Sequence, residues 1–127
     1  MSSLPRKDRV RIMAFLKKRD GLANDEFAAR WLDYAEIFRE LEIVKANILR
    51  YEQTYANDRF LEKFRAAGMK TAEFDAVAVL ESESYEKIFE VMASEEYAQK
   101  LAHLQTAFLD PDSLQWLPVD VVPIIDK

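Results

Sequence analysis

Apolar positions recur along the chain with two different periods, and short polar stretches separate the apolar segments. Residues 10–16, VRIMAFL, are a short apolar run with β-branched residues at one end, which predicts a strand. Residues 25–42 carry apolar side chains at helical spacing, which predicts a long amphipathic helix with Asn24 or Asp25 as its N-cap. Between these two segments, the sequence KKRDG predicts a turn at Gly21.

The rest of the chain continues as alternating strands and helices. Asn57, Ser84 and Ser94 stand where three further helices begin, and each side chain can accept a hydrogen bond from the first helical turn. Gly68 is expected to end the first of these helices, and the Asp-Pro pair at 110–111 the last. We therefore predict strands over residues 43–55, 73–81 and 116–125, and helices over residues 57–67, 85–92 and 95–107.

This order, β-α-β-α-β-α-α-β, predicts an α+β protein whose ferredoxin-like, four-stranded antiparallel sheet carries its helices on one face. Two prolines restrict the last strand to an edge or a bulge. The strands are apolar on both faces: Ile12, Ala14 and Leu16 alternate with Met13 and Phe15, and Val77 and Val79 alternate with Ala76, Ala78 and Leu80. A face without helices would expose a large apolar patch. We therefore predict a homodimer in which two copies pack sheet to sheet.

Composition indicates a small globular protein with a single domain, residues 1–127. Two glycines, no cysteine and one histidine argue against a glycine-rich phosphate loop, a disulfide, a thiolate nucleophile and a multi-histidine metal site, so we expect no metal and no cofactor. A net charge of −5 without a basic stripe disfavours nucleic acid. No segment resembles a membrane span, and MSSLPRKDR lacks the apolar core of a signal peptide, so we expect a cytoplasmic protein with no membrane partner.

The helix over residues 25–42 carries an aromatic stripe where most helices use leucine and alanine. Its members, within about 80° of one helix face, are Phe27, Trp31, Tyr34, Phe38 and Leu41. One interpretation is that all five pack as core. Trp31 and Tyr34, however, each have a polar tip that needs a partner when buried. We therefore expect core at both ends of the stripe and a substrate-binding pocket wall in the middle, with Phe38 beside it.

The second strand ends in Tyr51, Gln53 and Tyr55, which share one strand face. They are either a solvated strand end or polar groups that converge on an apolar cavity. Asp75 opens an otherwise apolar strand, and a buried carboxylate must be paired or neutral. Asp75 either accepts hydrogen bonds from backbone amides near a turn or acts beside Tyr51, if the two are cross-strand neighbours. Tyr51 and Asp75 are thus candidate catalytic residues, and Tyr55 is a candidate binding residue.

His103 is the only imidazole of the chain, and general acid–base catalysis most often uses histidine. Its helix is expected to bury Tyr97, Leu101 and Phe108, and His103 lies about 100° away from that stripe. His103 is therefore either solvated or a third catalytic candidate. Phe108 on this helix and Trp116 on the last strand complete the aromatic side chains that we expect to contact a substrate.

Four short motifs, in order and at the group's spacing, resemble the EthD-like group of dimeric α/β-barrel proteins, from about Arg11 to Ile125. KKRDGLANDEFAARW is similar to that group's K-R-x-G-L-S-x-E-E-F-x-x-x-W, RYEQTY to Y-x-Q-x-H, FDAVAVLES to Y-D-G-V-A-E, and AFLD to F-[IV]-D. The resemblance implies a cofactor-independent dimer with one pocket per subunit. It also implies a small enzyme of fungal secondary metabolism that dehydrates, decarboxylates or cyclises aromatic polyketides.

The sequence departs from these motifs at the positions where the group carries acids and bases. Ala35 stands where the group commonly has a histidine, Tyr55 replaces the histidine of Y-x-Q-x-H, and Leu104 and Gln105 replace an acidic pair. This protein therefore either uses other acids and bases or needs less help from them. The small side chain of Ala35 also leaves room for a flat ligand between the rings of the aromatic stripe.

The sequence supports two functions of different classes. The first is a lyase or cyclase that binds an aromatic or enolisable polyketide-type compound and moves a proton with Tyr51 or Asp75. One placed acid or base typically contributes about 10²–10⁴-fold, and a closed pocket can also accelerate ring closure by shape alone. The second is a non-catalytic dimer that binds a hydrophobic aromatic metabolite. A haem site is disfavoured because His103 is the only imidazole that could bind the iron.

Overall fold

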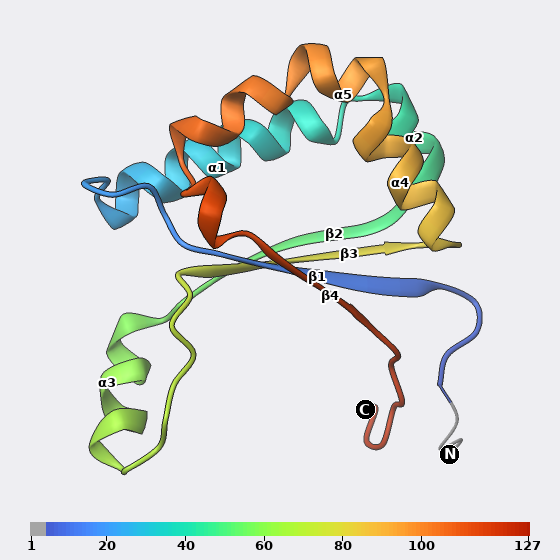
Figure 1. The fold of residues 1–127 in the computed structure, drawn as a ribbon. Coiled ribbons are helices and arrows are strands. Elements are labelled where there is room, and N and C mark those ends of the chain that lie inside the picture. Colours follow the sequence, from blue (N-terminus) through green and yellow to red (C-terminus); the bar gives the residue numbers. More distant parts are fainter. Residues whose placement is uncertain (1–4) are drawn as a thin grey trace.

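Helices cover one face of a four-stranded antiparallel sheet in the computed structural model, which describes residues 5–127 (Figure 1). The strands lie in the order β2-β3-β1-β4, and each neighbouring pair is antiparallel, which is the predicted ferredoxin-like arrangement. The elements are β1 (Val10–Leu16), α1 (Asn24–Phe38), α2 (Glu42–Asn47), β2 (Ile48–Tyr55), α3 (Asp58–Ala66), β3 (Ala76–Ser82), α4 (Tyr85–Ala93), α5 (Glu95–Lys100), the 3-10 helices η1 (Ala102–Ala107) and η2 (Pro111–Ser113), and β4 (Gln115–Val119).

The N-terminal segment that we expect to lack a signal peptide begins with residues 1–4, which lie outside the described residues. Within residues 5–127, no helix combines the length and the hydropathy that crossing a membrane requires.

The predicted helix caps are confirmed at three positions. The side chains of Asn57, Ser84 and Ser94 accept hydrogen bonds from backbone N–H groups in the first turns of α3, α4 and α5, at 3.3, 3.3 and 3.1 Å. Gly68 has a φ of +87°, a left-handed conformation that favours glycine, and it follows the end of α3 as predicted. These features depend on neighbouring residues only, which is why the sequence alone reveals them.

The region between α1 and β2 differs from the prediction. The helix expected over residues 25–42 ends at Phe38, and the first part of the strand expected over 43–55 is the short helix α2. The reason lies in α5, where the Glu96 carboxylate accepts hydrogen bonds from the backbone N–H groups of Glu42 and Ile43, at 2.9 and 3.0 Å. These two bonds satisfy the free N–H groups of a helix N-terminus and hold the pKa of Glu96 below its ordinary value.

The predicted N-cap of α1 is also wrong. Ala23 occupies the cap position and makes no side-chain bond there. The Asn24 side chain instead accepts a hydrogen bond from Lys18 Nζ and donates one to Asp58 at the start of α3. Asn24 therefore ties three segments together rather than capping its own helix.

The C-terminal elements are shorter than predicted. The helix expected to reach residue 107 ends at Lys100 and continues as the 3-10 helix η1. The strand expected over 116–125 covers only Gln115–Val119, with Pro118 on the edge strand as expected. Val119 pairs with Arg11, next to the first residue of β1, so β4 has almost no partner strand left beyond this point.

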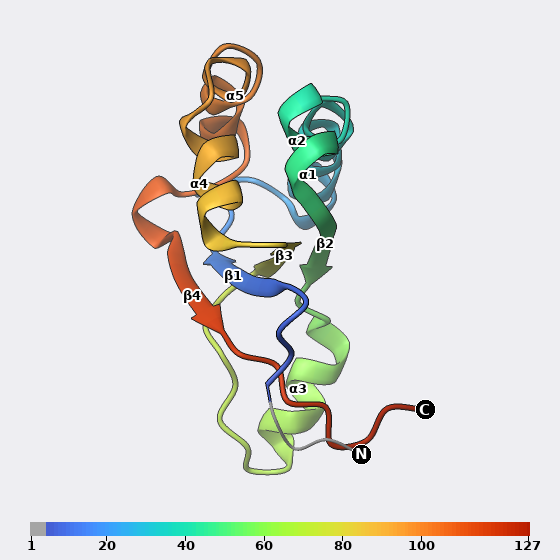
Figure 2. The same cartoon turned by 90° about the vertical axis from the view of Figure 1, so that its right-hand side faces the viewer.

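The two faces of the sheet have different surroundings. The helices α1, α2, α4 and α5 lie on one side, whereas α3 and the C-terminal segment after β4 lie on the other (Figures 1 and 2). On the helix side, alternate residues of β1 and β3 pack in the core with the aromatic stripe of α1. The opposite surface, which we call the open face, has an apolar centre formed by Met13, Phe15, Val77, Val79 and Leu117. The sequence pattern of apolar residues on both strand faces is thus realised in the fold.

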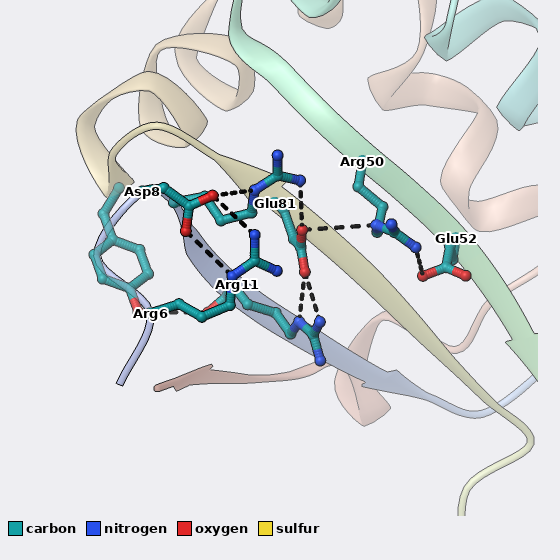
Figure 3. A network of polar contacts seen from close by, with 8 residues as sticks. Arg6, Asp8, Arg11, Arg50, Glu52 and Glu81 are labelled. Carbon is teal, nitrogen blue, oxygen red and sulfur yellow. Dashed lines mark hydrogen bonds and ion pairs between the residues drawn. The ribbon is translucent and has the colours of Figure 1, made fainter. Parts of the chain in front are cut away.

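A buried carboxylate lies at one end of the open face. The side chain of Glu81 is 1% exposed and accepts hydrogen bonds from Arg9 Nη1 at 2.9 Å and Arg11 Nε at 2.8 Å (Figure 3). Arg50 Nε lies 3.6 Å from the same carboxylate, and the strand register places Arg11 and Arg50 directly opposite Glu81. Burial alone would raise the pKa of Glu81, but the hydrogen bonds and charges of the arginines hold it below its ordinary value.

We expect Glu81→Gln to lower the free energy of unfolding at pH 7 by about 1–3 kcal/mol, because it removes two charge-assisted hydrogen bonds from a buried position. A carboxylate whose pKa is lowered by folding stabilises the protein above its unfolded pKa, near 4.5 for a glutamate, and loses that contribution as the pH falls. The difference between the wild type and the variant should therefore shrink in urea unfolding as the pH falls below that value. The exposed Glu83→Gln is the matched control, and an equal loss in both variants would contradict the assignment.

Candidate functional site

A small cavity lies between the helices and the sheet. Its volume is about 50 Å³, which is room for a few water molecules. Seven of its sixteen lining residues are aromatic, and they come from α1, β2, α5, the loop after η1 and β4. These aromatic residues are Trp31, Tyr34, Phe38, Tyr51, Tyr97, Phe108 and Trp116.

The cavity exists because small side chains occupy the middle of the sheet. One row across the four strands consists of Gln53, Ala78, Ala14 and Trp116, each opposite the next. The two central residues are alanines that are 6% and 3% exposed, and both line the cavity. The aromatic stripe of α1 faces these two alanines. Because their side chains are short, space remains between the rings and the sheet.

Two phenols and an amide meet on one side of the cavity. The hydroxyl oxygens of Tyr34 and Tyr97 are 2.6 Å apart, and Gln105 Nε2 donates a hydrogen bond to the Tyr97 hydroxyl. Tyr34 comes from α1, Tyr97 from α5 and Gln105 from η1, so this contact links the helix layer across the cavity. All three residues line the cavity wall.

A third phenol, Tyr51, lies on the strand side of the cavity. The Gln53 amide group donates to the Tyr51 hydroxyl at 3.0 Å and to the backbone oxygen of Trp31 at 2.9 Å. The amide oxygen of Gln53 accepts from the Tyr55 hydroxyl at 2.9 Å. The Gln53 amide is therefore held in one orientation, and the oxygen of Tyr51 is the acceptor of that bond.

The phenols of the cavity stay protonated at neutral pH. Burial raises the pKa of Tyr34, Tyr51 and Tyr97 above the ordinary value of a phenol. None of the described residues that line the cavity carries a carboxylate or an imidazole. Among residues 5–127 we also find no group of three histidine or acidic side chains placed to hold a metal ion. The cavity wall can therefore donate hydrogen bonds, but it has no side chain that readily takes up a proton at pH 7.

The structure brings together most of the residues that the sequence suggests for binding. Trp31, Tyr34, Phe38, Phe108 and Trp116 all line the cavity with Tyr51. Phe27 and Leu41, expected as core, are 3% and 1% exposed. Tyr55 does not line the cavity. It packs edge-on against Trp31, with ring centroids 5.1 Å apart, and is 44% exposed.

Two of the candidate catalytic residues lie away from the cavity. Tyr51 pairs across the strands with Leu80, so the expectation that Asp75 could be its cross-strand neighbour is wrong. Asp75 precedes β3 and accepts a hydrogen bond from the backbone N–H of Lys18 at 2.8 Å, as the alternative interpretation predicts. His103 is exposed on η1 and does not line the cavity.

Two residues of the site were not proposed from the sequence. Tyr97 appeared only as part of a buried stripe, and Gln105 only as a position where an acidic pair is missing. The signal that could identify them is the combination of both, since a polar residue eight positions after a buried tyrosine is within reach of its hydroxyl once the chain tightens into η1.

An apolar groove adjoins the cavity. The groove lies between α4 and the β1–β4 edge, has a volume of about 640 Å³ and is bordered by Ile12, Tyr85, Ile88, Phe89, Met92, Trp116 and Pro118. Ile88, Met92 and Trp116 line both the groove and the cavity. The space that we expect beside Ala35 is not part of the cavity. Ala35 borders a different groove, between α1 and the edge of β2.

Comparison with known proteins gives similarity in structure only. No protein-family model and no curated protein matches the sequence. A hydroxynitrile lyase from Passiflora edulis superposes with a TM-score of 0.62 at 12% identity, over 95% of this chain and 100% of that one. An EthD family protein from Bacillus halodurans gives 0.59 at 10% identity, over 90% and 99%. A dimeric ferredoxin-like protein of unknown function from Bacteroides fragilis gives 0.56 at 13% identity, over 91% and 96%. At these identities the likeness establishes the ferredoxin-like fold.

Proposed function

We propose that this protein is a small, cofactor-independent cytoplasmic enzyme of secondary metabolism. It binds an aromatic or enolisable polyketide-type compound in the cavity of each subunit and dehydrates, decarboxylates or cyclises it. The observation that carries this proposal is a cavity lined by three protonated phenols and further aromatic rings, next to a larger apolar groove that shares three of its lining residues. Such a combination of apolar walls and a few convergent polar groups is typical of small-molecule sites.

The chemistry of the proposed site follows from its phenols. A buried phenol donates a hydrogen bond to a carbonyl oxygen and binds it more strongly as negative charge develops there, which lowers the barrier to enol or enolate formation. Dehydration, decarboxylation of a β-keto acid and ring closure all pass through such a state. Because the described lining residues include no carboxylate or imidazole, the proton is removed by water or by a basic group of the substrate itself.

The sizes of the two hollows suggest how a ligand lies. The cavity of about 50 Å³ admits only a small part of a ligand, whereas the groove of about 640 Å³ is large enough for its aromatic body. We propose that the ligand enters between α4 and β4, with its carbonyl end inward. Ile88, Met92 and Trp116 then form the passage between the two compartments.

Binding can be measured with the protein's own tryptophans. The chain has two, Trp31 and Trp116, and both line the cavity. We expect the indole N–H signals of both to shift in NMR spectra when a bicyclic aryl ketone such as 1-tetralone is added. Ala14→Val, which fills the cavity floor, should weaken this binding about tenfold. Ala29→Val, on the exposed face of α1, is the control, and equal affinity in the two variants would contradict the proposed site.

A non-catalytic binder is the second candidate function. It is favoured by one observation, the lack of a carboxylate or imidazole among the described lining residues. The two candidates separate when an enolisable aryl ketone is incubated with the protein in D₂O. Deuterium uptake at the α-carbon above the buffer rate supports the enzyme, whereas tight binding without added exchange supports the binder.

We also propose that two copies pack through their open faces. The apolar centre of this face includes Leu117, which is 48% exposed. The helix α3 projects on the same side of the sheet (Figure 1). It has no buried residue, and even its two large apolar side chains, Phe60 and Phe64, are 47% and 53% exposed. A helix of nine residues without buried side chains gains little stability by itself, and a second copy would cover it. The dimeric assembly named for the Bacteroides fragilis neighbour supports the proposal.

A further inference from the structure

The contact between Tyr34, Tyr97 and Gln105 fixes the hydrogen-bonding character of the cavity. Tyr34 and Tyr97 are 9% and 4% exposed, so their hydroxyls are shielded from bulk water. Their oxygens share one hydrogen bond of 2.6 Å, in which either can be the donor. Gln105 supplies the other contact of the group by donating an amide proton to the Tyr97 oxygen.

The Tyr34–Tyr97 pair has one more hydroxyl proton than its hydrogen bonds use. Two neutral phenols bring two hydroxyl protons, and the bond between them uses one. The bond from Gln105 uses an amide proton, so it consumes none of the phenolic protons. Apart from each other and the donating Gln105 amide, neither hydroxyl has a hydrogen-bond partner among residues 5–127. Whichever tyrosine donates to the other, one phenolic proton remains, and both phenols line the cavity.

We infer that the Tyr34–Tyr97 pair, with the Gln105 amide beside it as a donor and not as an acceptor, keeps one phenolic proton for the cavity, so that the site selects ligands with a carbonyl or enolate oxygen. This inference rests on the proposed ligand-binding function and specifies the part of the ligand that the cavity recognises. A buried hydroxyl proton without an acceptor is unfavourable, so a ligand oxygen that accepts it gains both the bond and the removal of that cost.

The role of Gln105 follows from its being a donor. With a carboxylate in its place, the acceptor would take the Tyr97 proton, Tyr34 would donate to Tyr97, and no phenolic proton would remain for a ligand. With an apolar side chain of similar length, Tyr34 and Tyr97 would still share one bond, and one proton would still face the cavity. Two substitutions of similar size therefore differ in their effect: Gln105→Glu should weaken the preference for a carbonyl ligand, whereas Gln105→Met should keep it.

The test uses two probes of the same shape, acetophenone and α-methylstyrene, in which C=CH₂ replaces C=O. Affinities are measured at about pH 8, where a carboxylate is ionised, from the indole signals of Trp31 and Trp116, for the wild type, Gln105→Glu and Gln105→Met. We expect the wild type and Gln105→Met to prefer acetophenone by a similar factor. Gln105→Glu should lose about three- to tenfold of that preference, the equivalent of one hydrogen bond. Tyr51 contributes equally in all three proteins.

Other outcomes overturn the inference. A preference that rises in Gln105→Met would mean that the Gln105 oxygen accepts from Tyr97 in the wild type. An equal fall in both variants would mean that Gln105 only supports the packing, and no change in Gln105→Glu would mean that the spare phenolic proton does not set the preference. If circular dichroism shows that Gln105→Glu does not fold, two other proteins test the inference. Gln105→Met should keep the preference for acetophenone, and the double variant Tyr34→Phe/Tyr97→Phe should lose it. Failure of the wild type to bind either probe would instead overturn the proposed function.

Discussion

Replacing Tyr51 with phenylalanine is expected to lower the rate of enzyme-catalysed α-proton exchange at least about tenfold, a bound set below the about 10²–10⁴-fold that one catalytic acid or base typically contributes. Tyr51 is the cavity phenol whose oxygen already accepts a hydrogen bond from Gln53, which leaves its own proton for a ligand. Burial keeps that proton in place by raising the pKa of Tyr51. The measurement is the rate of deuterium uptake by 1-tetralone, followed by NMR, with the wild type and the variant at equal fractional saturation.

Two controls separate this effect from a loss of folding. His103→Ala should leave the exchange rate unchanged, because His103 is exposed and lies outside the cavity. Asp75→Asn should affect stability more than rate, because the Asp75 carboxylate accepts a backbone hydrogen bond from Lys18 at the end of β1. A full rate in Tyr51→Phe would leave shape-driven catalysis or simple binding. A loss confined to His103→Ala would move the active site to η1.

Replacing Leu117 with aspartate is expected to convert a dimer into a monomer at micromolar concentration. Leu117 lies on β4 opposite Met13, in the centre of the open face, and is 48% exposed in the single subunit. In a sheet-to-sheet dimer the carboxylate would be buried without a partner, which we expect to weaken association by at least about 100-fold. Size-exclusion chromatography with light scattering should give about twice the 14.8 kDa chain mass for the wild type and about 14.8 kDa for the variant.

Leu32→Asp is the matched control, since Leu32 is 53% exposed on α1, on the opposite side of the sheet. This variant should remain dimeric and unfold at the same urea concentration as the wild type. A monomeric wild type would overturn the dimer proposal. Dissociation by Leu32→Asp, with Leu117→Asp still dimeric, would move the interface to the helix layer.

The sequence was sufficient for the parts of the fold that depend on short stretches of chain. The strand β1 has the predicted bounds, and three caps and the glycine after α3 occur where their residue types indicate. The helix α2 was missed because its N-terminus is stabilised by Glu96, more than fifty residues away. Within residues 42–47 alone, an apolar pattern fits a strand as well as a helix. No local pattern records which distant carboxylate will meet a free N–H group.

The candidate site divides in the same way. The aromatic spacing of α1 determined that Trp31, Tyr34 and Phe38 share one face, because the helical period fixes which side chains point together. Only the tertiary structure decided what meets that face. The strand register placed Ala14 and Ala78 beneath it, set Tyr51 beside the cavity and left Asp75 outside. The packing of α5 and η1 brought Tyr97 and Gln105 to Tyr34, and such contacts between distant segments depend on the packed geometry of the whole chain rather than on any single stretch of it.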